Sequence, residues 1–140
     1  MLINLSNHSS SKWSGKQLEA AKQYGKIIDI TFPNIDPAAT SEQVANLVRE
    51  YSHKVDLIAE PLIDSEECFI HIMGEMSFVH GFLSKTAYDC MCSTTERKSV
   101  ETVNNDGSTT KTMVFEFVQF RAYQNVPYCR GTYDCPGWTS

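Results

Sequence analysis

Short apolar segments alternate with segments of helical periodicity along the first two thirds of the sequence. Near-continuous apolar runs are typical of strands buried on both faces, and parallel strands need crossover helices between them. The sequence therefore predicts an α/β fold whose core is a four-stranded parallel sheet flanked by helices, with right-handed crossovers. The expected strands are 2–5, 27–32, 68–73 and 90–92, and the expected helices are 14–24, 40–58 and 75–87.

Two of these helices begin with a capping-box spacing. Ser14 lies three residues before Gln17, and Thr40 lies three residues before Gln43. The hydroxyl at such a site binds a free backbone N–H of the first turn, and the Gln side chain binds back to the cap. Gly25 is expected to end the first helix. The second helix carries one apolar stripe, made of Val44, Leu47, Val48, Tyr51, Val55 and Ile58.

After Ser93 the pattern changes to β-prone runs. Residues 98–103 and 112–120 flank Asn104-Asn105-Asp106-Gly107, and Asp-Gly is a strong hairpin signal. We therefore expect a C-terminal antiparallel hairpin that completes the sheet. Periodicity is lost from Gln124 onward, which predicts one domain over 1–123 and a tail over 124–140. The aromatic residues of this tail either pack on a partner subunit or cover a sheet edge; they are Tyr128, Tyr133 and Trp138.

The net charge of -5, from 17 acidic and 12 basic residues, disfavours binding to long nucleic acids. A small pocket can still bind phosphates through local N–H groups, hydroxyls and one or two cations. The sequence shows neither a signal-peptide pattern nor an apolar run long enough to span a bilayer, so we expect a cytoplasmic protein without membrane contact. Three of the five cysteines lie in apolar segments and are expected to be reduced core thiols: Cys68, Cys90 and Cys92.

Ligands of open α/β sheets bind outside the carboxyl ends of the strands. This rule selects the loops 6–12, 34–39, 74–77 and 93–97. The first loop offers donors, an acid/base and a cation: Ser6, Asn7, His8, Ser9, Ser10 and Lys12. His8 acts either as an acid/base or as a loop histidine that binds a backbone carbonyl. His71, inside an apolar strand, is expected to be a satisfied core residue, and His53 to lie on a helix surface.

The other loops carry two more clusters. Gly74, Glu75, Met76 and Ser77 form either a strand-to-helix turn that approaches a ligand or a tight turn in which Glu75 stabilises the helix dipole. Ser93, Thr94, Thr95, Glu96 and Arg97 combine hydroxyls, a carboxylate and a guanidinium, as a phosphate site or as a capped turn with a surface ion pair. Arg121 is a further candidate. No Cys or His pairs stand at zinc-ligand spacing, so we expect no cofactor and metal-independent chemistry.

The chain resembles a family of small CRISPR-associated accessory proteins of type III systems, which are related to CARF domains and include ring nucleases. The similar segments are Leu2 to His8, Gly74 to Phe78, Ser93 to Arg97 and Phe115 to Tyr123. Their order and spacing carry the resemblance. The chain departs from the family in its extra tail and in Gln119, where the family's closing strand leads us to expect an arginine.

The resemblance implies a Rossmann-like, CARF-like fold and a homodimer that binds a cyclic oligoadenylate second messenger. In such ring nucleases a ribose 2′-hydroxyl attacks the adjacent phosphate without metal and leaves a 2′,3′-cyclic phosphate. His8 would act as acid/base or phosphate donor, and Lys12 and Arg97 would neutralise phosphate charge. Glu96 would contact an adenine edge or act as an alternative base, and the ring would be oriented by Asn7, Ser10, Thr94 and Thr95.

Two other functions are alternatives to the ring nuclease. A sponge or sensor would hold the messenger without cleaving it, and it would need nearly the same contacts. A flavodoxin-like nucleotide or nucleoside enzyme, unrelated to CRISPR systems, would share only the fold.

Overall fold

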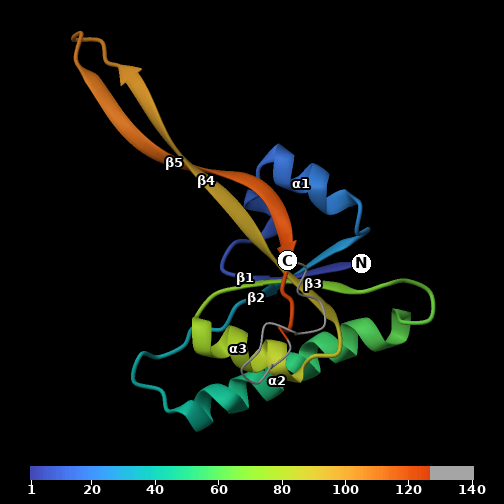
Figure 1. Ribbon diagram of the computed structural model, residues 1–140. Helices are drawn as coiled ribbons and strands as arrows, with labels where there is room; N and C mark the ends of the chain where they lie inside the picture. Colours follow the sequence, from blue (N-terminus) through green and yellow to red (C-terminus); the bar gives the residue numbers. More distant parts are fainter. Residues whose placement is uncertain (127–140) are drawn as a thin grey trace, which may run out of the picture.

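Five strands form one mixed sheet in the order β2-β1-β3-β4-β5, and helices cover both of its faces (Figure 1). The structure, a computed structural model, describes residues 1–126. The strands are β1 (Leu2–Ser6), β2 (Ile27–Thr31), β3 (Phe69–Met73), β4 (Asp89–Val103) and β5 (Thr109–Ala122). The helices are α1 (Gly15–Lys22) on one face, with α2 (Ser41–Ala59) and α3 (Met76–Lys85) on the other. The predicted α/β class is confirmed.

The pairing of the strands decides which loops meet. Strand β1 pairs in parallel with both β2 and β3, and β3 pairs in parallel with the first residues of β4. Strands β4 and β5 are antiparallel, which confirms the predicted hairpin. Its turn is closed by the Gly107 N–H, which donates to the Asn104 carbonyl oxygen at 3.0 Å, and Gly107 has a φ of 84° that favours glycine. The loops after β1 and β3 therefore lie side by side.

The capping residues behave differently in the two predicted boxes. At α2 both halves form: the Thr40 hydroxyl accepts from the Gln43 N–H at 3.1 Å, and the Gln43 side chain accepts from the Thr40 N–H at 2.8 Å. At α1 the Ser14 hydroxyl accepts from the Gln17 N–H at 3.2 Å, but the Gln17 side chain reaches away to Ser93. Only half of that box forms, and the Gln17 side chain lines a pocket instead, where its amide donates to Ser93.

Alternation along β1 divides the core between the two faces of the sheet. Ile3 and Leu5 pack with Phe78 and Phe82 beneath α2 and α3, whereas Leu2 packs with Trp13 beneath α1. Asn4 and Ser6 share the face of Leu2, so polar side chains are buried on the α1 side.

The prediction that residues 93–97 form a loop is wrong, because β4 continues without a break from Asp89 to Val103. No Gly or Pro interrupts this stretch, and β5 provides backbone partners from Met91 to Val103. A register shift lies between Thr94 and Thr95, beyond Met91, the last residue of β4 that pairs with β3. Beyond it, β4 and β5 project together as a two-stranded arm (Figure 1).

Within the described residues Cys68, Cys90 and Cys92 are free cysteines; Cys90 is buried in the core as expected, whereas Cys68 and Cys92 are only partly buried. The tail residues Tyr128, Tyr133 and Trp138 lie outside the described residues. None of the helices within residues 1–126 combines the length and the apolar character needed to cross a membrane.

Candidate functional site

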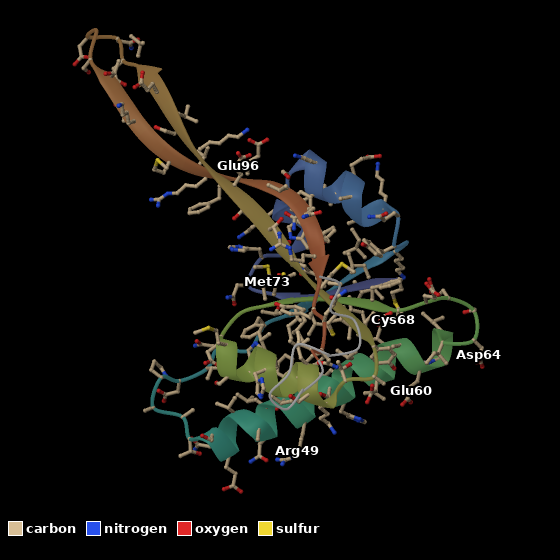
Figure 2. The ribbon with its side chains drawn as sticks, in the orientation of Figure 1. Arg49, Glu60, Asp64, Cys68, Met73 and Glu96 are labelled. Atoms are coloured by element: carbon tan, nitrogen blue, oxygen red, sulfur yellow. The ribbon has the colours of Figure 1, made fainter. Side chains whose placement is uncertain are left out.

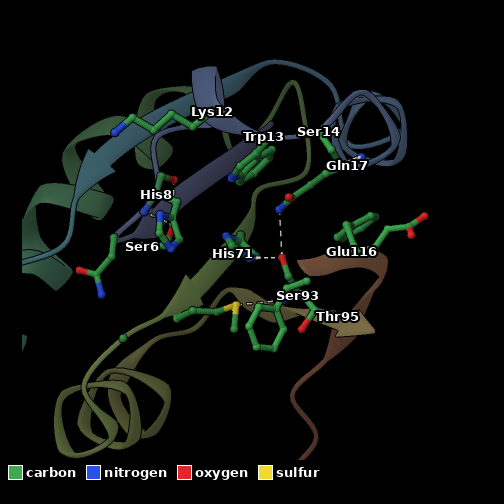
Figure 3. Close-up of a pocket in the computed structure, with 15 residues that line it drawn as sticks. Ser6, His8, Lys12, Trp13, Ser14, Gln17, His71, Ser93, Thr95 and Glu116 are labelled. Atoms are coloured by element: carbon green, nitrogen blue, oxygen red, sulfur yellow. Dashed lines mark hydrogen bonds between the residues drawn. The ribbon is translucent and has the colours of Figure 1, made fainter. Parts of the chain in front are cut away.

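A pocket of about 670 Å³ opens at the carboxyl ends of β1 and β3, against the wall formed by β4 and β5 (Figure 3). Trp13 and the buried His71 form part of its lining, and the rings of Phe115 and Phe117 contribute from β5. Its polar lining comes from the loop after β1, from α1 and from the sheet. These polar residues are Ser6, Asn7, His8, Lys12, Ser14, Gln17, Ser93, Thr95 and Glu116.

Several predicted site residues, from three separate segments, meet in this pocket. Ser6, Asn7, His8 and Lys12 arrive from the first loop, Gly74 from the end of β3, and Ser93 and Thr95 from β4. The His8 carbonyl oxygen accepts from the Asn4 amide at 2.8 Å, which fixes the loop backbone, while the imidazole is exposed at the pocket. The loop 34–39 does not line this pocket.

Ser9 and Ser10 lie outside the pocket lining and hold the loop in place. The Ser10 hydroxyl donates to the Asp29 carboxylate at 2.7 Å, and the Ser9 hydroxyl donates to it at 3.4 Å. Their contacts fasten the 3₁₀ turn of residues 10–12 to the middle of β2. Both serines therefore have structural partners in this structure.

The segment after β3 contributes Gly74 alone to the pocket. Glu75 is the N-cap of α3, and its carboxylate accepts from the N–H groups of Ser77 at 3.1 Å and Phe78 at 2.9 Å. These bonds and that of the Ser77 hydroxyl lower the pKa of Glu75. Met76 and Ser77 are the first residues of the helix and do not line the pocket. In this structure Glu75 therefore caps α3, as in the interpretation in which it stabilises the helix, and Gly74 lines the pocket.

Along β4 the predicted cluster is divided between faces. Ser93 and Thr95 line the pocket, whereas the Thr94 hydroxyl donates to the Gln119 carbonyl oxygen at 3.1 Å. Glu96, in the arm of Figure 2, lies 3.9 Å from the Lys98 ammonium, so the predicted pairing with Arg97 is replaced by one with lysine. Arg97 is exposed opposite Phe115.

Arg121 sits near the end of β5, opposite Cys92, and is exposed outside the pocket lining. The Glu116 carboxylate, by contrast, lines the pocket and lies 2.9 Å from the Lys98 ammonium. Hydrogen bonding to Lys98 lowers the pKa of Glu116 and raises that of Lys98. Lys98 thereby offsets an acidic charge at the pocket mouth.

Gly74 is required by the core beneath it. A Cβ at this position would overlap the ring of Phe32, which is buried and packs edge-on against Phe78 with ring centroids 4.9 Å apart. We expect Gly74→Ala to lower the free energy of unfolding by roughly 1–3 kcal/mol, measured by urea denaturation. Gly15→Ala is the control, because a Cβ there meets open space at the start of α1. Equal stability of the two variants would contradict this prediction.

Beneath the pocket runs a chain of hydrogen bonds through Gln17, Ser93, His71, Asn4 and Asp29, which we call the hydrogen-bond chain. Gln17 Nε2 lies 3.1 Å from Ser93 Oγ, and His71 Nε2 lies 2.7 Å from the same oxygen (Figure 3). His71 Nδ1 lies 2.8 Å from Asn4 Oδ1, and Asn4 Nδ2 lies 2.7 Å from Asp29 Oδ1. The chain thus connects a surface carboxylate to a hydroxyl in the pocket.

His71 is satisfied and buried, as predicted for a core histidine. It is only 2% exposed, and the edges of Trp13 and Phe120 lie against it with ring centroids 5.3 Å and 5.5 Å away. Burial lowers the pKa of His71 to about 4. Its imidazole is therefore neutral near pH 7, although both ring nitrogens have partners.

Asn4, Asp29 and Gln17 are members of the site that sequence reasoning missed. Asp29, Asn4 and His71 occupy matching positions on the adjacent strands β2, β1 and β3. A polar residue at the same position of three apolar segments was the available signal. Gln17 gave no such signal, since its capping role was a sufficient explanation.

A family model described as "Uncharacterized protein MJ1673 family" matches residues 1–121 of the chain. No curated protein and no solved structure matches the chain. The matched range includes every residue that lines the pocket.

Proposed function

Because the chain belongs to the uncharacterized MJ1673 family, its function must be argued from the pocket, and we propose that it is a ring nuclease for cyclic oligoadenylate. In this proposal the protein binds and cleaves the second messenger of type III CRISPR defence without metal. The domain is then a Rossmann-like, CARF-like nucleotide-binding domain. The single observation that carries the proposal is the convergence of His8, Lys12, Ser93 and Thr95 on one pocket at the carboxyl ends of the strands.

The residues of this pocket suit a phosphodiester next to a ribose. The Lys12 ammonium supplies a positive charge for the phosphate, and the Asn7 amide and the Thr95 hydroxyl supply donors. The aromatic rings of Trp13, Phe115 and Phe117 supply apolar surface of the kind on which a base stacks. Charge, hydroxyls and aromatic surface therefore occur within one cavity.

In the proposed reaction the ribose 2′-oxygen attacks the neighbouring phosphorus. A bond forms between the 2′-oxygen and phosphorus, and the bond from phosphorus to the 5′-oxygen breaks. The 2′-hydroxyl proton passes to the His8 imidazole, the departing 5′-oxygen takes one proton from water, and the hydroxide left behind takes the proton back from His8. The products are a 2′,3′-cyclic phosphate and a free 5′-hydroxyl, so no water molecule or metal is consumed. Holding the 2′-oxygen in line with the leaving oxygen supplies much of the rate.

The size of the pocket favours shared binding of the ring by two copies of the chain. Pockets of 300–1,000 Å³ typically enclose ligands of drug size, and a cyclic oligoadenylate is larger and symmetric. We propose that two protomers face each other and each holds one part of the ring. In this arrangement Arg97, Glu96 and Arg121, outside the pocket lining, are available to the outer parts of the ring.

His8→Ala is the variant that tests the acid/base role. We expect cleavage to fall about a hundredfold or more while affinity changes little, because the imidazole acts on the transferred proton. Purified protein is incubated with labelled cyclic tri-, tetra- and hexa-adenylate, and the products are separated by chromatography. His53→Ala is the control, since His53 is exposed on α2 as predicted.

The outcomes separate the candidate functions. Tight binding with every ring left intact would overturn the nuclease proposal and make the protein a sponge or sensor. Unchanged turnover in His8→Ala would remove His8 as the base. If the protein neither binds nor cleaves any of the rings, the assignment to cyclic oligoadenylate is overturned.

A further inference from the structure

The hydrogen-bond chain has a fixed direction, which starts at Asp29. Burial raises the pKa of this carboxyl, but hydrogen bonds from Asn4, Ser10 and Ser9 outweigh that effect and leave the pKa below its ordinary value. An ionised carboxylate only accepts hydrogen bonds, and so does the His8 carbonyl oxygen. The Asn4 side-chain atom that faces both acceptors, at 2.7 Å and 2.8 Å, is therefore the NH₂ group. Asn4 Oδ1 must then face the interior.

The direction of the Asn4 amide fixes the tautomer of His71. Asn4 Oδ1 is an acceptor, so His71 Nδ1, 2.8 Å away, must carry a proton and donate it. The ring is neutral near pH 7 because burial lowers its pKa, which leaves Nε2 without a proton. His71 Nε2 is consequently a permanent acceptor, aimed at Ser93.

The tautomer in turn fixes the Ser93 hydroxyl. Its only proton points at His71 Nε2, 2.7 Å away, and one of its two lone pairs accepts from the Gln17 amide at 3.1 Å. One lone pair is left, and Ser93 lines the pocket. Toward a ligand, Ser93 is therefore an acceptor only, although serine hydroxyls in general both donate and accept.

We propose that Ser93 is a catalytic residue that accepts a hydrogen bond from the 2′-hydroxyl of the ribose next to the attacking one in the ring. This inference rests on the proposed function and adds a contact to the same site. A phosphate oxygen carries no proton and cannot fill the position, whereas a ribose hydroxyl can. The acceptor would distinguish ribose from deoxyribose, and by holding this neighbouring ribose it would keep the attacking 2′-oxygen in line with the leaving oxygen.

His71 and Asn4 are positioning residues in this scheme, because they act through Ser93 and do not touch the substrate. Their polar atoms are buried, at 2% and 1% exposure of the two residues, so bulk water does not compete for these hydrogen bonds. The aromatic edges of Trp13 and Phe120 hold the imidazole in its plane.

The kinetic test compares Ser93→Ala with Ser84→Ala. Ser84 is exposed on α3, and its hydroxyl donates only to the His80 carbonyl oxygen of the same helix. We expect Ser93→Ala to lower kcat about a hundredfold, since alignment is lost, and to weaken binding of the ribose ring only about tenfold, since the phosphate contacts remain. Ser93→Thr, which restores a hydroxyl, should recover part of the rate. Wild-type kcat in Ser93→Ala would overturn the inference.

A binding test compares the ribose ring with a 2′-deoxy ring, which cannot react. Stopped-flow tryptophan fluorescence, with Trp13 in the pocket as a reporter, measures binding before cleavage. Wild type should bind a 2′-deoxy ring about tenfold more weakly than the ribose ring, whereas Ser93→Ala should bind both equally. Equal affinities in wild type would overturn the ribose contact.

The direction of the chain is tested without any ligand. Nitrogen-15 NMR of the histidine side chains should show His71 with its proton on Nδ1 at pH 7, and a proton on Nε2 would overturn the inference. If wild type binds no cyclic oligoadenylate at all, the proposed function fails and the ribose contact with it. If wild type cleaves the rings and only the Ser93 predictions fail, the proposed function stands and this inference is wrong.

Discussion

Replacement of Asn4 with alanine is expected to lower the free energy of unfolding by about 3 kcal/mol or more. The Asn4 amide is 1% exposed and donates to Asp29 and the His8 carbonyl oxygen, while its oxygen accepts from His71 and Ser6. Removing it leaves the buried His71 Nδ1–H without a partner, which costs roughly 1–3 kcal/mol. It also frees the loop backbone at His8 and opens a small cavity.

Urea denaturation measures this effect as a shift of the midpoint at constant m value. Asn46→Ala is the matched control, because Asn46 is exposed on α2 and its side chain accepts a hydrogen bond from the exposed Arg49 side chain. Its effect is expected to stay within about 0.5 kcal/mol. Similar midpoints for the two variants would show that the Asn4 amide does not organise the site.

Acid is expected to destabilise the protein through His71 before the carboxyl groups titrate. The folded-state pKa of His71 is lowered to about 4, whereas the ordinary value is 6.5. Between these two values the unfolded chain binds a proton at His71 that the folded protein does not bind. The stability contributed by neutral His71 is therefore fully present above pH 6.5 and is lost as the pH drops toward 4. The loss amounts to roughly 3 kcal/mol over this window, and most of it develops between pH 6 and 4.

The measurement is the urea midpoint at half-unit steps from pH 7.5 to 5. This range avoids the carboxyl groups whose pKa values are lowered, namely Asp29, Glu75, Asp106 and Glu116, because they are protonated only in more acidic solution. His71→Gln, which cannot titrate, should remove most of the slope. A slope that survives in His71→Gln would assign the acid sensitivity to another group.

Much of the fold could be predicted from local pattern. The stripe from Val44 to Ile58 and the Thr40 capping box predicted α2, which runs from Ser41 to Ala59. The strand at 2–5 and the turn at Asp106-Gly107 were equally local signals, and both are confirmed. Such features depend on interactions within a few residues, which the sequence displays directly.

The run of β4 through residues 93–97 could not be predicted in this way. Hydroxyl residues and a charged pair are typical of loops, and only the pairing with a distant strand turns them into sheet. The division of Thr94 and Thr95 between faces depends on that same pairing. The error is therefore one of long-range pairing and not of local propensity.

At the site, position within the sheet predicted the convergence of the first loop with Gly74 and Ser93. The roles of His8, Lys12, Glu96 and Arg97 stay predictions. The sequence did not reveal the hydrogen-bond chain, because it joins residues that are far apart in the sequence, such as Asn4 and His71. Its members become visible only once the register of β1, β2 and β3 is known.

Strand β4 runs without a break from the sheet to the tip of the arm. Its first residues pair with β3 and β5 in the sheet, and its last residues lead into the turn at 104–108. Between them, Ser93 and Thr95 line the pocket. The strand contains neither glycine nor proline, the residues that most often interrupt a strand. One continuous backbone therefore joins the tip of the arm to the pocket wall, so a partner that binds the tip is attached directly to the strand that carries Ser93.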